Sequence, residues 1–506
     1  MTTSSPAYIM ALDLGTTGNR AILFGKDGNI VGQAYKELTQ YYPQPGWVEH
    51  DPREIWADIS WAMKSAVQKS QIEPSQIAAI GLTVQRETCL LWDKDTGRPL
   101  YNAIVWQDRR TAPLCNRLRE AGHAPDIYDR TGLFLDAYFS ATKLAWLLDT
   151  VKAQSDPPVD LDQVLAGTVD AWVLWNLTGR KVHATDHSNA SRNMLLNLKT
   201  REWDSTLLDL FGAPAHMMPT VQPSLGEFGV TDADILGVEI PITAIFGDQQ
   251  SALFGHGCDH PGLLKCTYGT GAFLVAHTGL EIARSQNQLL STIAWTEATG
   301  NNSAKVGYAL EGSMFTAGAC IQWLRDGVKL ITSAAETDLL ATNVSDNGGV
   351  YFVPALSGLG APHWDMSARG AFLGITSGVQ RQHMVRAVLE AIAYEVNEVV
   401  QAVNQDSGAP IQQLKVDGGA CQNNFLMQFQ ADVLGIPVER PAILDVTAQG
   451  AAFAAGLAAG FWDDYPTLIK TRKIDRVFEP GAGERVAQEN FIIWQKAVER
   501  AKNWAE

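Results

Sequence analysis

The 506-residue chain lacks the features that mark zinc-binding, redox or secreted proteins. Its six cysteines are scattered, and no two of them have the spacing of a zinc or dithiol motif. We therefore expect them to be small, inert thiols in a reducing cytosol. No basic and apolar leader opens the sequence, and no apolar run reaches the roughly 20 residues that span a bilayer. These absences predict a cytoplasmic protein without a membrane span.

Positive charge is also scarce. The chain has 39 Lys and Arg residues against 55 Asp and Glu residues, so its formal net charge is −16. A surface for nucleic acid or anionic lipid needs a basic field, and we expect neither of these partners. A small anionic ligand remains compatible, because one arginine and a few backbone N–H groups are enough to hold it.

Two common nucleotide-binding motifs are missing as well. The one Gly-Lys pair, Gly25-Lys26, is followed by Asp27 where a P-loop has Ser or Thr. No Gly-x-Gly-x-x-Gly follows the first apolar run, which disfavours a Rossmann dinucleotide site. Any nucleotide site in this chain must therefore be built differently.

The sequence does contain a glycine-rich turn between two apolar runs, 8–12 and 21–24, which we predict to be strands. The turn carries Asp13, Gly15, Thr16, Thr17, Gly18 and Arg20. Glycine backbone and threonine hydroxyls can approach phosphate closely, and Arg20 adds a fixed positive charge. Asp13 suits a hydrated magnesium ion, which takes only one or two carboxylates. An ordinary glycine-rich hairpin is the alternative interpretation.

Length and periodicity predict two α/β domains. A chain of this length exceeds the roughly 250–300 residues at which a single core stops growing. We place the domains at 1–256 and 257–506, with the boundary in 256–262. Helices are expected at 52–69, after Asp51 as N-cap, at 382–405 and from about Asn423, and an Ala- and Gly-rich core helix at 447–459. Residues 154–162 are polar and predict a surface loop.

Polar residues follow two predicted strands, 77–83 and 240–246, and ligands of α/β sheets bind beyond such carboxyl ends. Arg86 and Glu87 follow the first strand and suit a polyol, whose hydroxyls both donate and accept hydrogen bonds. A solvated ion pair is the alternative. Asp248 follows the second strand and suits a general base that takes the proton of an alcohol during phosphoryl transfer. A helix N-cap is the alternative there.

Two further glycine-bearing turns lie later in the chain, at 268–271 and 417–419. Their order after the first hairpin matches the actin-like ATPases, in which two hairpins hold the phosphates and a Gly-Gly turn holds adenosine. The predicted fold class is therefore α/β, a two-domain actin-like ATPase (ribonuclease H-like) fold of the hexokinase–Hsp70–actin superfamily. Trp106 and Phe273 suit the apolar walls of a polyol site, or are simply core. His183, His187 and His256 have no metal-ligand spacing and are taken as structural.

Longer stretches make the match specific. They lie at 45–52, 85–88, 101–107, 247–250, 311–323 and 416–419. With them, the chain resembles the glycerol kinases of the FGGY carbohydrate kinase family from about Tyr8 to near Trp504. The resemblance implies phosphorylation of glycerol by ATP to give sn-glycerol 3-phosphate, with Mg²⁺ as cofactor and closure of two lobes to exclude water.

The resemblance also implies roles by position. The glycerol-binding residues would be Arg86, Glu87, Tyr138, Asp248 and Gln249, with Trp106 and Phe273 as candidate walls. The nucleotide would lie against Thr16, Thr17, Gly18, Arg20, Thr270, Gly318, Gln322, Gly419 and Asn423. Asp13 and Asp248 would lie near magnesium, and Asp248 would also act as the base.

The sequence departs from familiar bacterial relatives at two places. Gly18-Asn19 stands where they carry Ser and a variable residue, which removes one hydroxyl donor and predicts tuning rather than loss. The loop 226–241 lacks the Gly-Gly…Arg element that binds fructose 1,6-bisphosphate in some relatives, and the histidine that is phosphorylated in others. Control by either route is therefore not expected.

Three questions stay open at this point. Relatives form dimers or tetramers, and the sequence does not select a homo-dimer or a homo-tetramer. The substrate of the same fold could be another polyol or a sugar such as xylulose or gluconate. A different class, a nucleotide-switched binding protein without a phosphorylated product, also uses this fold.

Overall fold

The computed structural model describes residues 6–154, 159–299 and 303–505. The chain forms two compact units. The first unit comprises Met1–Gly257, Ser291–Tyr308 and Val446–Thr471, and the second comprises Cys258–Leu290, Ala309–Asp445 and Arg472–Glu506. Two segments from the later half of the chain thus belong to the first unit. A single boundary in 256–262 divides the sequence but does not describe these units.

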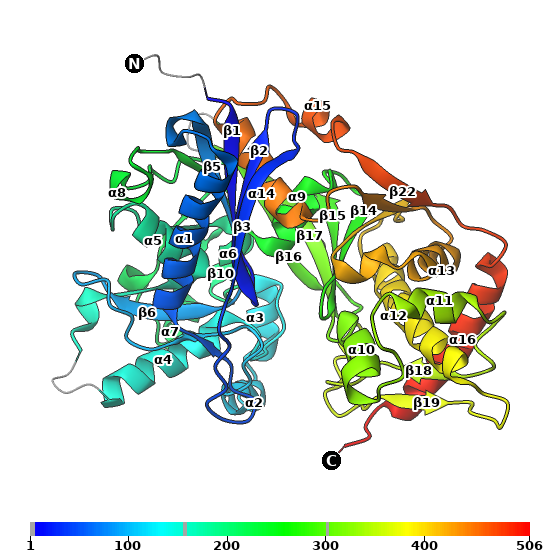
Figure 1. The fold of residues 1–506 in the computed structure, drawn as a ribbon. Coiled ribbons are helices and arrows are strands. Elements are labelled where there is room, and N and C mark those ends of the chain that lie inside the picture. Colours follow the sequence, from blue (N-terminus) through cyan, green and yellow to red (C-terminus); the bar gives the residue numbers. More distant parts are fainter. Residues whose placement is uncertain (1–5, 155–158, 300–302, 506) are drawn as a thin grey trace. The chain divides into compact units, whose positions relative to one another are not determined.

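The first unit is built on a five-stranded sheet in the order β13-β5-β1-β2-β3 (Figure 1). Its strands are β1 (Tyr8–Leu14), β2 (Gly18–Gly25), β3 (Ile30–Glu37), β5 (Ile77–Val84) and β13 (Ile242–Gly247). The strands β1 and β13 pair in parallel with β5, whereas β2 and β3 continue the sheet as antiparallel hairpins. The predicted strands are confirmed, and three of them end at the same edge.

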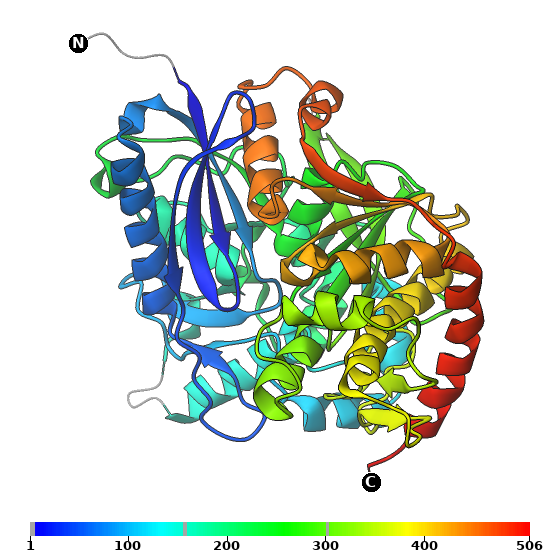
Figure 2. The ribbon, with the colours of Figure 1, turned by 45° about the vertical axis from the view of Figure 1, so that its right-hand side comes forward.

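Helices cover both faces of this sheet (Figure 2). On one face, α1 (Pro52–Ser70) buries Ile55, Ile59 and Met63 in the core that also holds Leu12. Asp51 accepts a hydrogen bond from the Arg53 backbone N–H as the N-cap, and a proline begins the helix, as predicted.

The other face is covered by α14 (Val446–Ala458), which packs beside α9 (Asp248–Gly255). A Cβ atom at Gly450 would overlap the Ser251 carbonyl of α9, and one at Gly81 of β5 would overlap the Ala451 carbonyl of α14. The small residues of this helix therefore permit backbone-to-backbone packing, which confirms the predicted core helix.

The rest of the first unit is a smaller sheet with a cover of helices. This four-stranded sheet has the order β4-β7-β6-β8. Its strands are β4 (Glu49–His50), β7 (Ala103–Ile104), β6 (Cys89–Asp93) and β8 (Val164–Thr168), and the main helices around it are α2 (Ala112–Glu120), α3 (Ala124–Thr131), α4 (Ser140–Gln154) and α5 (Val169–Leu177). The loop predicted at 154–162 falls partly on 155–158, which lie outside the described residues.

A seven-stranded sheet has the order β16-β17-β15-β14-β20-β21-β22. Its strands are β14 (Leu263–Tyr268), β15 (Ala272–Gly279), β16 (Leu290–Thr299), β17 (Ser303–Met314), β20 (Gln413–Asp417), β21 (Val438–Pro441) and β22 (Ile474–Phe478). The strands β14, β15, β20, β21 and β22 lie in the second unit. The parallel pair of β14 and β20 is central to that unit, and the two strands end together, with Thr267 opposite Asp417.

Helices pack beside this part of the sheet. They are α10 (Gly318–Gln322), α11 (Glu336–Thr342), α12 (Arg381–Asp406), α13 (Asn424–Leu434) and α16 (Glu484–Ala501). The long helix α12 buries Val388, Ile392 and Val396 in the main core of the unit. The helix α13 begins at Asn424, with Asn423 as its N-cap, which confirms the predicted helix start near Asn423.

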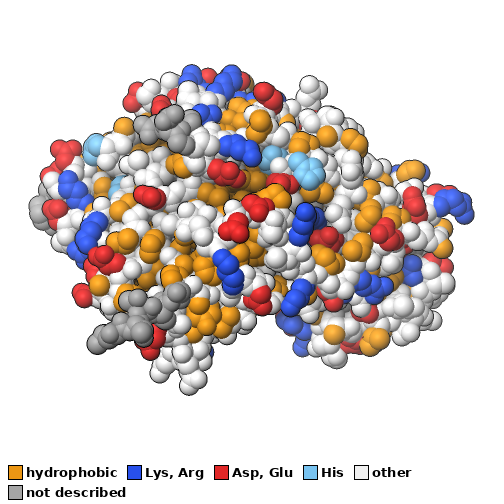
Figure 3. Space-filling model, turned by 90° about the horizontal axis from the view of Figure 1, so that it is seen from above, with side chains coloured by type: hydrophobic (Ala, Val, Ile, Leu, Met, Phe, Trp, Pro, Cys, Tyr) orange, Lys and Arg blue, Asp and Glu red, His pale blue; other side chains and the backbone are white. Residues whose placement is uncertain are grey.

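The cysteines and the surface agree with the composition. All six cysteines are buried and free. On the face shown in Figure 3, Lys and Arg side chains are interspersed with Asp and Glu. Within the described ranges, no helix combines the length and the hydrophobicity needed to cross a bilayer.

Candidate active site

The carboxyl ends of three parallel strands bring the predicted residues of the first unit together. Val84 of β5 pairs with Leu14 of β1 on one side and with Gly247 of β13 on the other. The turn after Asp13, the segment from Gln85 to Thr88 and the start of α9 at Asp248 therefore lie along one edge. The sequence predicted this edge as a ligand site.

A buried arginine holds the proposed base. Arg86 Nε lies 3.2 Å from Asp248 Oδ1, and Arg86 Nη1 donates a hydrogen bond of 3.2 Å to Gln250 Oε1. The Arg86 side chain is only 2% exposed, whereas that of Asp248 is 29% exposed. Arg86 Nε also lies 3.9 Å from Glu87 Oε1, and both of these side chains are buried, so the alternative of a solvated Arg86–Glu87 ion pair is wrong. The arginine is fixed inside the fold, and the Asp248 carboxylate that it orients stays accessible.

Asp248 is the first residue of α9 rather than its N-cap, a position that Gly247 takes. Its Oδ1 atom accepts a hydrogen bond of 2.7 Å from the backbone N–H of Gln249, which is itself buried. A carboxylate in the first turn is stabilised by the positive end of the helix dipole. Both the helix start and the arginine therefore fix the position of this carboxylate at the edge of the sheet.

Glu87 is held by an arginine that sequence reasoning missed. Arg192 Nε lies 2.7 Å from Glu87 Oε1, and both side chains are buried. Glu87 also has a φ of 60°, a left-handed conformation that is uncommon for a non-glycine residue and that clusters at functional sites. No motif around Arg192 signals this contact, because the two residues are 105 positions apart.

Aromatic residues connect this cluster to the glycine-rich hairpin. The Arg192 guanidinium lies 5.8 Å from the ring centroid of Tyr138, and that ring packs edge-on against Trp106 at 5.7 Å. The Trp106 indole N–H donates a hydrogen bond of 2.8 Å to Thr16 Oγ1. Thus the predicted polyol-binding and phosphate-binding residues of the first unit form one contiguous set.

The hairpin is shaped by close packing. Arg20 Nε lies 3.4 Å from Asp13 Oδ2, and the Tyr35 hydroxyl donates to the Thr17 carbonyl at 3.3 Å. A Cβ atom at Gly18 would overlap the Tyr35 ring, so a serine at position 18 would require this ring to move. Glycine at position 18, where familiar relatives have serine, is therefore matched by the nearby Tyr35 ring on β3.

Three uncharged side chains, those of Gln40, His50 and Gln85, support the backbone of the hairpin. Sequence reasoning missed these contacts too. Gln40 Nε2 donates to the Thr16 carbonyl at 2.7 Å, and Gln85 Nε2 donates to the Gly15 carbonyl at 3.3 Å. His50 bridges the two amides, at 2.9 Å from Gln40 and 3.4 Å from Gln85. Burial lowers the pKa of His50 to about 4, so this histidine is neutral at physiological pH.

In the second unit, three glycine-bearing turns converge on Tyr268–Thr270. The Gly318 N–H donates to the Gly269 carbonyl at 3.0 Å, and a Cβ atom at Gly418 would overlap the Tyr268 carbonyl. Gly418 also has a φ of 86°, which favours glycine. By contrast, nothing lies within 4 Å of the position of a Cβ atom at Gly419, and Thr270 is exposed. Backbone groups here are open to an anion.

The remaining predicted residues of the second unit, Asn423, Gln322 and Phe273, differ in their burial and in their contacts. Asn423 Oδ1 accepts from the Leu426 N–H at 2.8 Å, and its Nδ2 donates to Thr337 Oγ1 at 2.9 Å, so its side chain has a structural task. Gln322 ends α10 and is exposed. Phe273 is partly buried on β15, and it belongs to the second unit, unlike the other candidate glycerol-binding residues.

The predicted magnesium ligands offer a sparse set of hard oxygen atoms. Asp13 lies on β1 and Asp248 follows β13, and β5 separates these two strands. Among the residues that the structure describes, no group of three or more His, Cys, Asp or Glu side chains forms a metal site. The arrangement fits Mg²⁺, which keeps most of its water and takes one or two carboxylates, and does not fit zinc.

Buried titratable groups elsewhere in the first unit have structural roles. Burial lowers the pKa of His183 and of His187 to about 4 and raises that of Asp170 to about 6. Burial also raises the pKa of the Cys89 thiol to about 12. The thiol is therefore unreactive, and the histidines are neutral, as predicted for structural residues.

Known proteins match the chain along most of its length. Residues 8–255 match the N-terminal domain of the FGGY family of carbohydrate kinases, and residues 264–459 match its C-terminal domain. The chain is 74% identical over 503 residues to a glycerol kinase from Acaryochloris marina (strain MBIC 11017), covering 99% of this chain and 100% of that one.

Solved structures agree with the fold. Plasmodium falciparum glycerol kinase with ADP is similar at a TM-score of 0.90 and 35% identity, with 98% of each chain covered. A ligand-bound xylulose kinase from Lactobacillus acidophilus is similar at 0.86 and 22% identity, covering 97% of this chain and 98% of that one, which shows the fold alone. The predicted two-domain actin-like ATPase fold is confirmed. The chain belongs to the FGGY family of carbohydrate kinases.

Proposed function

We propose that this chain phosphorylates glycerol with ATP, giving sn-glycerol 3-phosphate and ADP. Its curated relatives include glycerol kinases that match over the full length, and the family as a whole consists of carbohydrate kinases. The single observation that carries the assignment of roles is the open Asp248 carboxylate held by the buried Arg86. A fixed acceptor for the proton of a hydroxyl group is what this reaction requires from a protein.

Asp248 acts as the general base of the proposed reaction. Its carboxylate accepts the proton of a terminal hydroxyl of glycerol while that oxygen bonds to the γ-phosphorus of ATP. The bond between the γ-phosphorus and the bridging oxygen breaks, and ADP leaves with the electron pair. Arg86 and the backbone N–H of Gln249 orient the carboxylate toward the site.

Recognition of glycerol follows from paired charges and an aromatic wall. Arg86 donates hydrogen bonds to hydroxyl oxygens, and Glu87 accepts hydrogen bonds from hydroxyl groups, so the donor and the acceptor of a hydroxyl each find a partner. Arg192 fixes Glu87 in place, and Trp106 and Tyr138 face the carbon backbone. Gln249 and Phe273 complete the proposed set.

The nucleotide is proposed to bind through backbone groups and small side chains. In the first unit, Thr16, Thr17, Gly18 and Arg20 would take phosphate oxygens. In the second unit the set would be Thr270, Gly318, Gln322, Gly419 and Asn423. The bare surroundings of Gly419 support this part of the proposal, since a ligand can approach the main chain there. Mg²⁺, when bound near Asp13 and Asp248, neutralises phosphate charge.

The test is incubation of the full chain with ATP, magnesium and a panel of alcohols, with release of ADP and the product identified by mass spectrometry. We expect glycerol to be the preferred substrate and sn-glycerol 3-phosphate to be the product. A preference for xylulose or gluconate would assign the chain to another branch of the family. ATP binding with no phosphorylated product would indicate a nucleotide-switched binding protein instead.

Two wider expectations belong with this proposal. We expect the enzyme to work in the cytoplasm, where glycerol and ATP are available together. We expect a homo-dimer or a homo-tetramer, and sedimentation velocity distinguishes the two by mass. We expect neither nucleic acid nor a membrane as a partner.

A further inference from the structure

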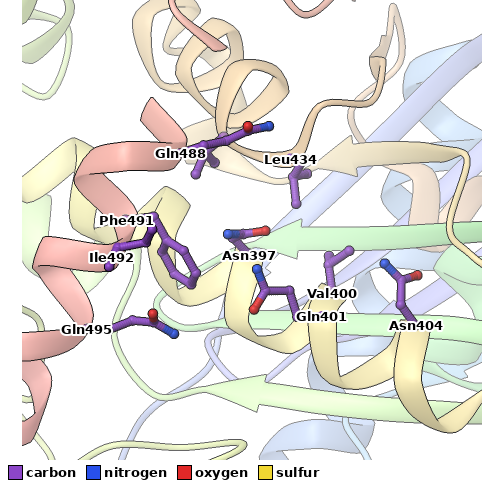
Figure 4. A pocket seen from close by; sticks show the side chains of 10 residues that line it. Asn397, Val400, Gln401, Asn404, Leu434, Gln488, Phe491, Ile492 and Gln495 are labelled. Carbon is purple, nitrogen blue, oxygen red and sulfur yellow. The ribbon is translucent and has the colours of Figure 1, made fainter. Parts of the chain in front are cut away.

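The second unit contains a pocket between three helices, shown in Figure 4. Its volume is about 490 Å³. Its lining consists of Asn397, Val400, Gln401 and Asn404 of α12, Val433 and Leu434 of α13, and Gln488, Phe491, Ile492 and Gln495 of α16.

This pocket is separate from the proposed nucleotide site. The helix α13 begins at Asn424, beside the glycine turn at the end of β20, and ends at Leu434, which lines the pocket. Eleven helical residues span roughly 16 Å at 1.5 Å per residue. The pocket therefore lies at the opposite end of α13 from the turn at Gly418 and Gly419.

The chemistry of the lining is unusual because it is polar but uncharged. Five of the ten lining residues are Asn or Gln, and the other five are apolar. Each carboxamide offers both donors and an acceptor. No lysine or arginine lines the pocket, so it offers nothing to neutralise a phosphate or carboxylate. A charged metabolite is thus a poor fit.

Three of these carboxamides are left for a ligand. Within the described part of the chain, the side chains of Asn397, Gln401 and Gln495 make no hydrogen bond to protein, although Asn397 is only 5% exposed. The other two are engaged. Asn404 Oδ1 accepts from the Ile411 N–H at 2.7 Å, and Gln488 Nε2 donates to Glu484 Oε1 at 3.3 Å.

Figure 4 shows Asn397 and Gln401 lying between Phe491 and Gln495 on one side and Val400 on the other. Although the Asn397 residue is mostly buried, its carboxamide nitrogen and oxygen are not among the fully buried polar atoms without a partner, so they stay accessible from the pocket. Asn397 is therefore placed to bind a polar group that enters the pocket.

We infer that this pocket binds a neutral, polyhydroxylated ligand of about the size of a disaccharide. Hydroxyl groups donate and accept at once, as carboxamides do, and the C–H faces of a sugar ring suit the accessible apolar side chains of Leu434 and Ile492. The volume lies within the range of about 300–1,000 Å³ that is typical of small-molecule pockets. The inference goes beyond glycerol phosphorylation and does not depend on it.

The experiment is calorimetric titration of the full chain with trehalose, maltose and sucrose, and with trehalose 6-phosphate as the charged analogue. At least one neutral disaccharide should bind saturably. The phosphorylated sugar should bind about tenfold more weakly than trehalose or not at all, since its charge would be desolvated without a cation.

Single substitutions distinguish binding in the pocket from binding elsewhere on the surface. Asn397→Leu and Gln401→Leu should each weaken binding of the neutral disaccharide about tenfold through a lost hydrogen bond. Gln405→Leu is the matched control, because Gln405 is exposed one turn further along α12 and does not line the pocket. It should bind like the unchanged chain. Phosphorylation of glycerol is measured in parallel and should be unaltered in all three.

Three results would overturn the inference. The first is the absence of saturable binding by every neutral disaccharide, and the second is equal binding in the two pocket variants and the control. The third is a change of mass in sedimentation for Gln401→Leu without any sugar binding, which would make this face a contact between copies. Each is independent of whether glycerol is phosphorylated.

Discussion

The two units present their candidate ligand-binding groups in contrasting ways. The first unit uses charged side chains that are buried and paired, above all Arg86, Glu87 and Arg192. The second unit uses main chain that is left bare, at the turns around Gly318 and Gly419. A small polyol carries no charge and needs strong donors and acceptors in fixed positions. A nucleotide carries its own charge, so oriented N–H groups suffice if side chains stay out of the way.

The largest effect should come from the proposed base. Asp248→Asn keeps the shape of the side chain but cannot take a proton, and we expect kcat to fall about 10³-fold. Nucleotide affinity, measured by titration with ADP, should stay nearly unchanged, because none of the residues proposed to contact the nucleotide is altered. Retained turnover in a coupled ADP assay would remove Asp248 from the role of base.

The next effect tests the buried charges. Arg86→Ala removes contacts to Asp248 and Gln250, and we expect kcat/KM for glycerol to fall about 10- to 100-fold, the equivalent of about 1.5–3 kcal/mol. Arg117→Ala is the control, since Arg117 is an exposed arginine of the same unit. Equal losses of kcat/KM in the two variants would show that the loss comes from removing a positive charge in general and not from the contacts of Arg86.

Alanine substitutions at two adjacent glycines test whether the second unit binds the nucleotide through its main chain. Gly418→Ala should destabilise the protein by about 1–3 kcal/mol, because the residue has a positive φ and its Cβ atom would overlap the Tyr268 carbonyl. Gly419→Ala meets nothing within 4 Å and should leave thermal unfolding unchanged while it weakens ADP binding. If both variants lower the melting temperature equally, Gly419 has a structural role and is not simply open to a ligand.

A pH series tests the buried histidines of the first unit. The pKa values of His50, His183 and His187 are lowered by burial to about 4, so their stabilisation is complete above the unfolded value and is lost as the pH falls from about 6.5 towards 4. Asp170 opposes this trend: its pKa is raised to about 6, and its contribution is lost as the pH rises through that value.

Burial also raises the pKa of Asp186, Glu390 and Glu395, so these acids oppose the histidines as Asp170 does. The test is therefore the difference between the unchanged chain and His183→Gln in urea unfolding at pH 7 and at pH 5. The variant should lose less free energy of unfolding on acidification than the unchanged chain, by about 1 kcal/mol or more, because it lacks one neutral buried histidine. Equal losses in the two proteins would contradict the assignment.

Local signals in the sequence predicted the elements well. Asp51 with Pro52 marked the start of α1, and the strand ends before Arg86 and Asp248 marked the site, because caps and strand termini depend on neighbouring residues. Contacts over long separations were not predictable in this way. Arg192 reaches Glu87 across 105 positions, and His50 lies between Gln40 and Gln85 with no motif to announce it.

The grouping of 446–471 with the first unit was missed for a similar reason. The Ala- and Gly-rich pattern predicted a buried helix, but small residues do not specify which surface they will meet. The partner became visible only through the close approach of Gly450 to Ser251 and of Gly81 to Ala451.

The place of α14 in the first unit has a practical consequence for dividing this protein. A fragment that stops at Gly257 would lack the helix that covers one face of its central sheet, leaving apolar residues such as Ile9 exposed to water. Such a fragment would aggregate rather than fold. A separately expressed first half must therefore carry a grafted copy of 446–471, or the helix must be supplied as a peptide.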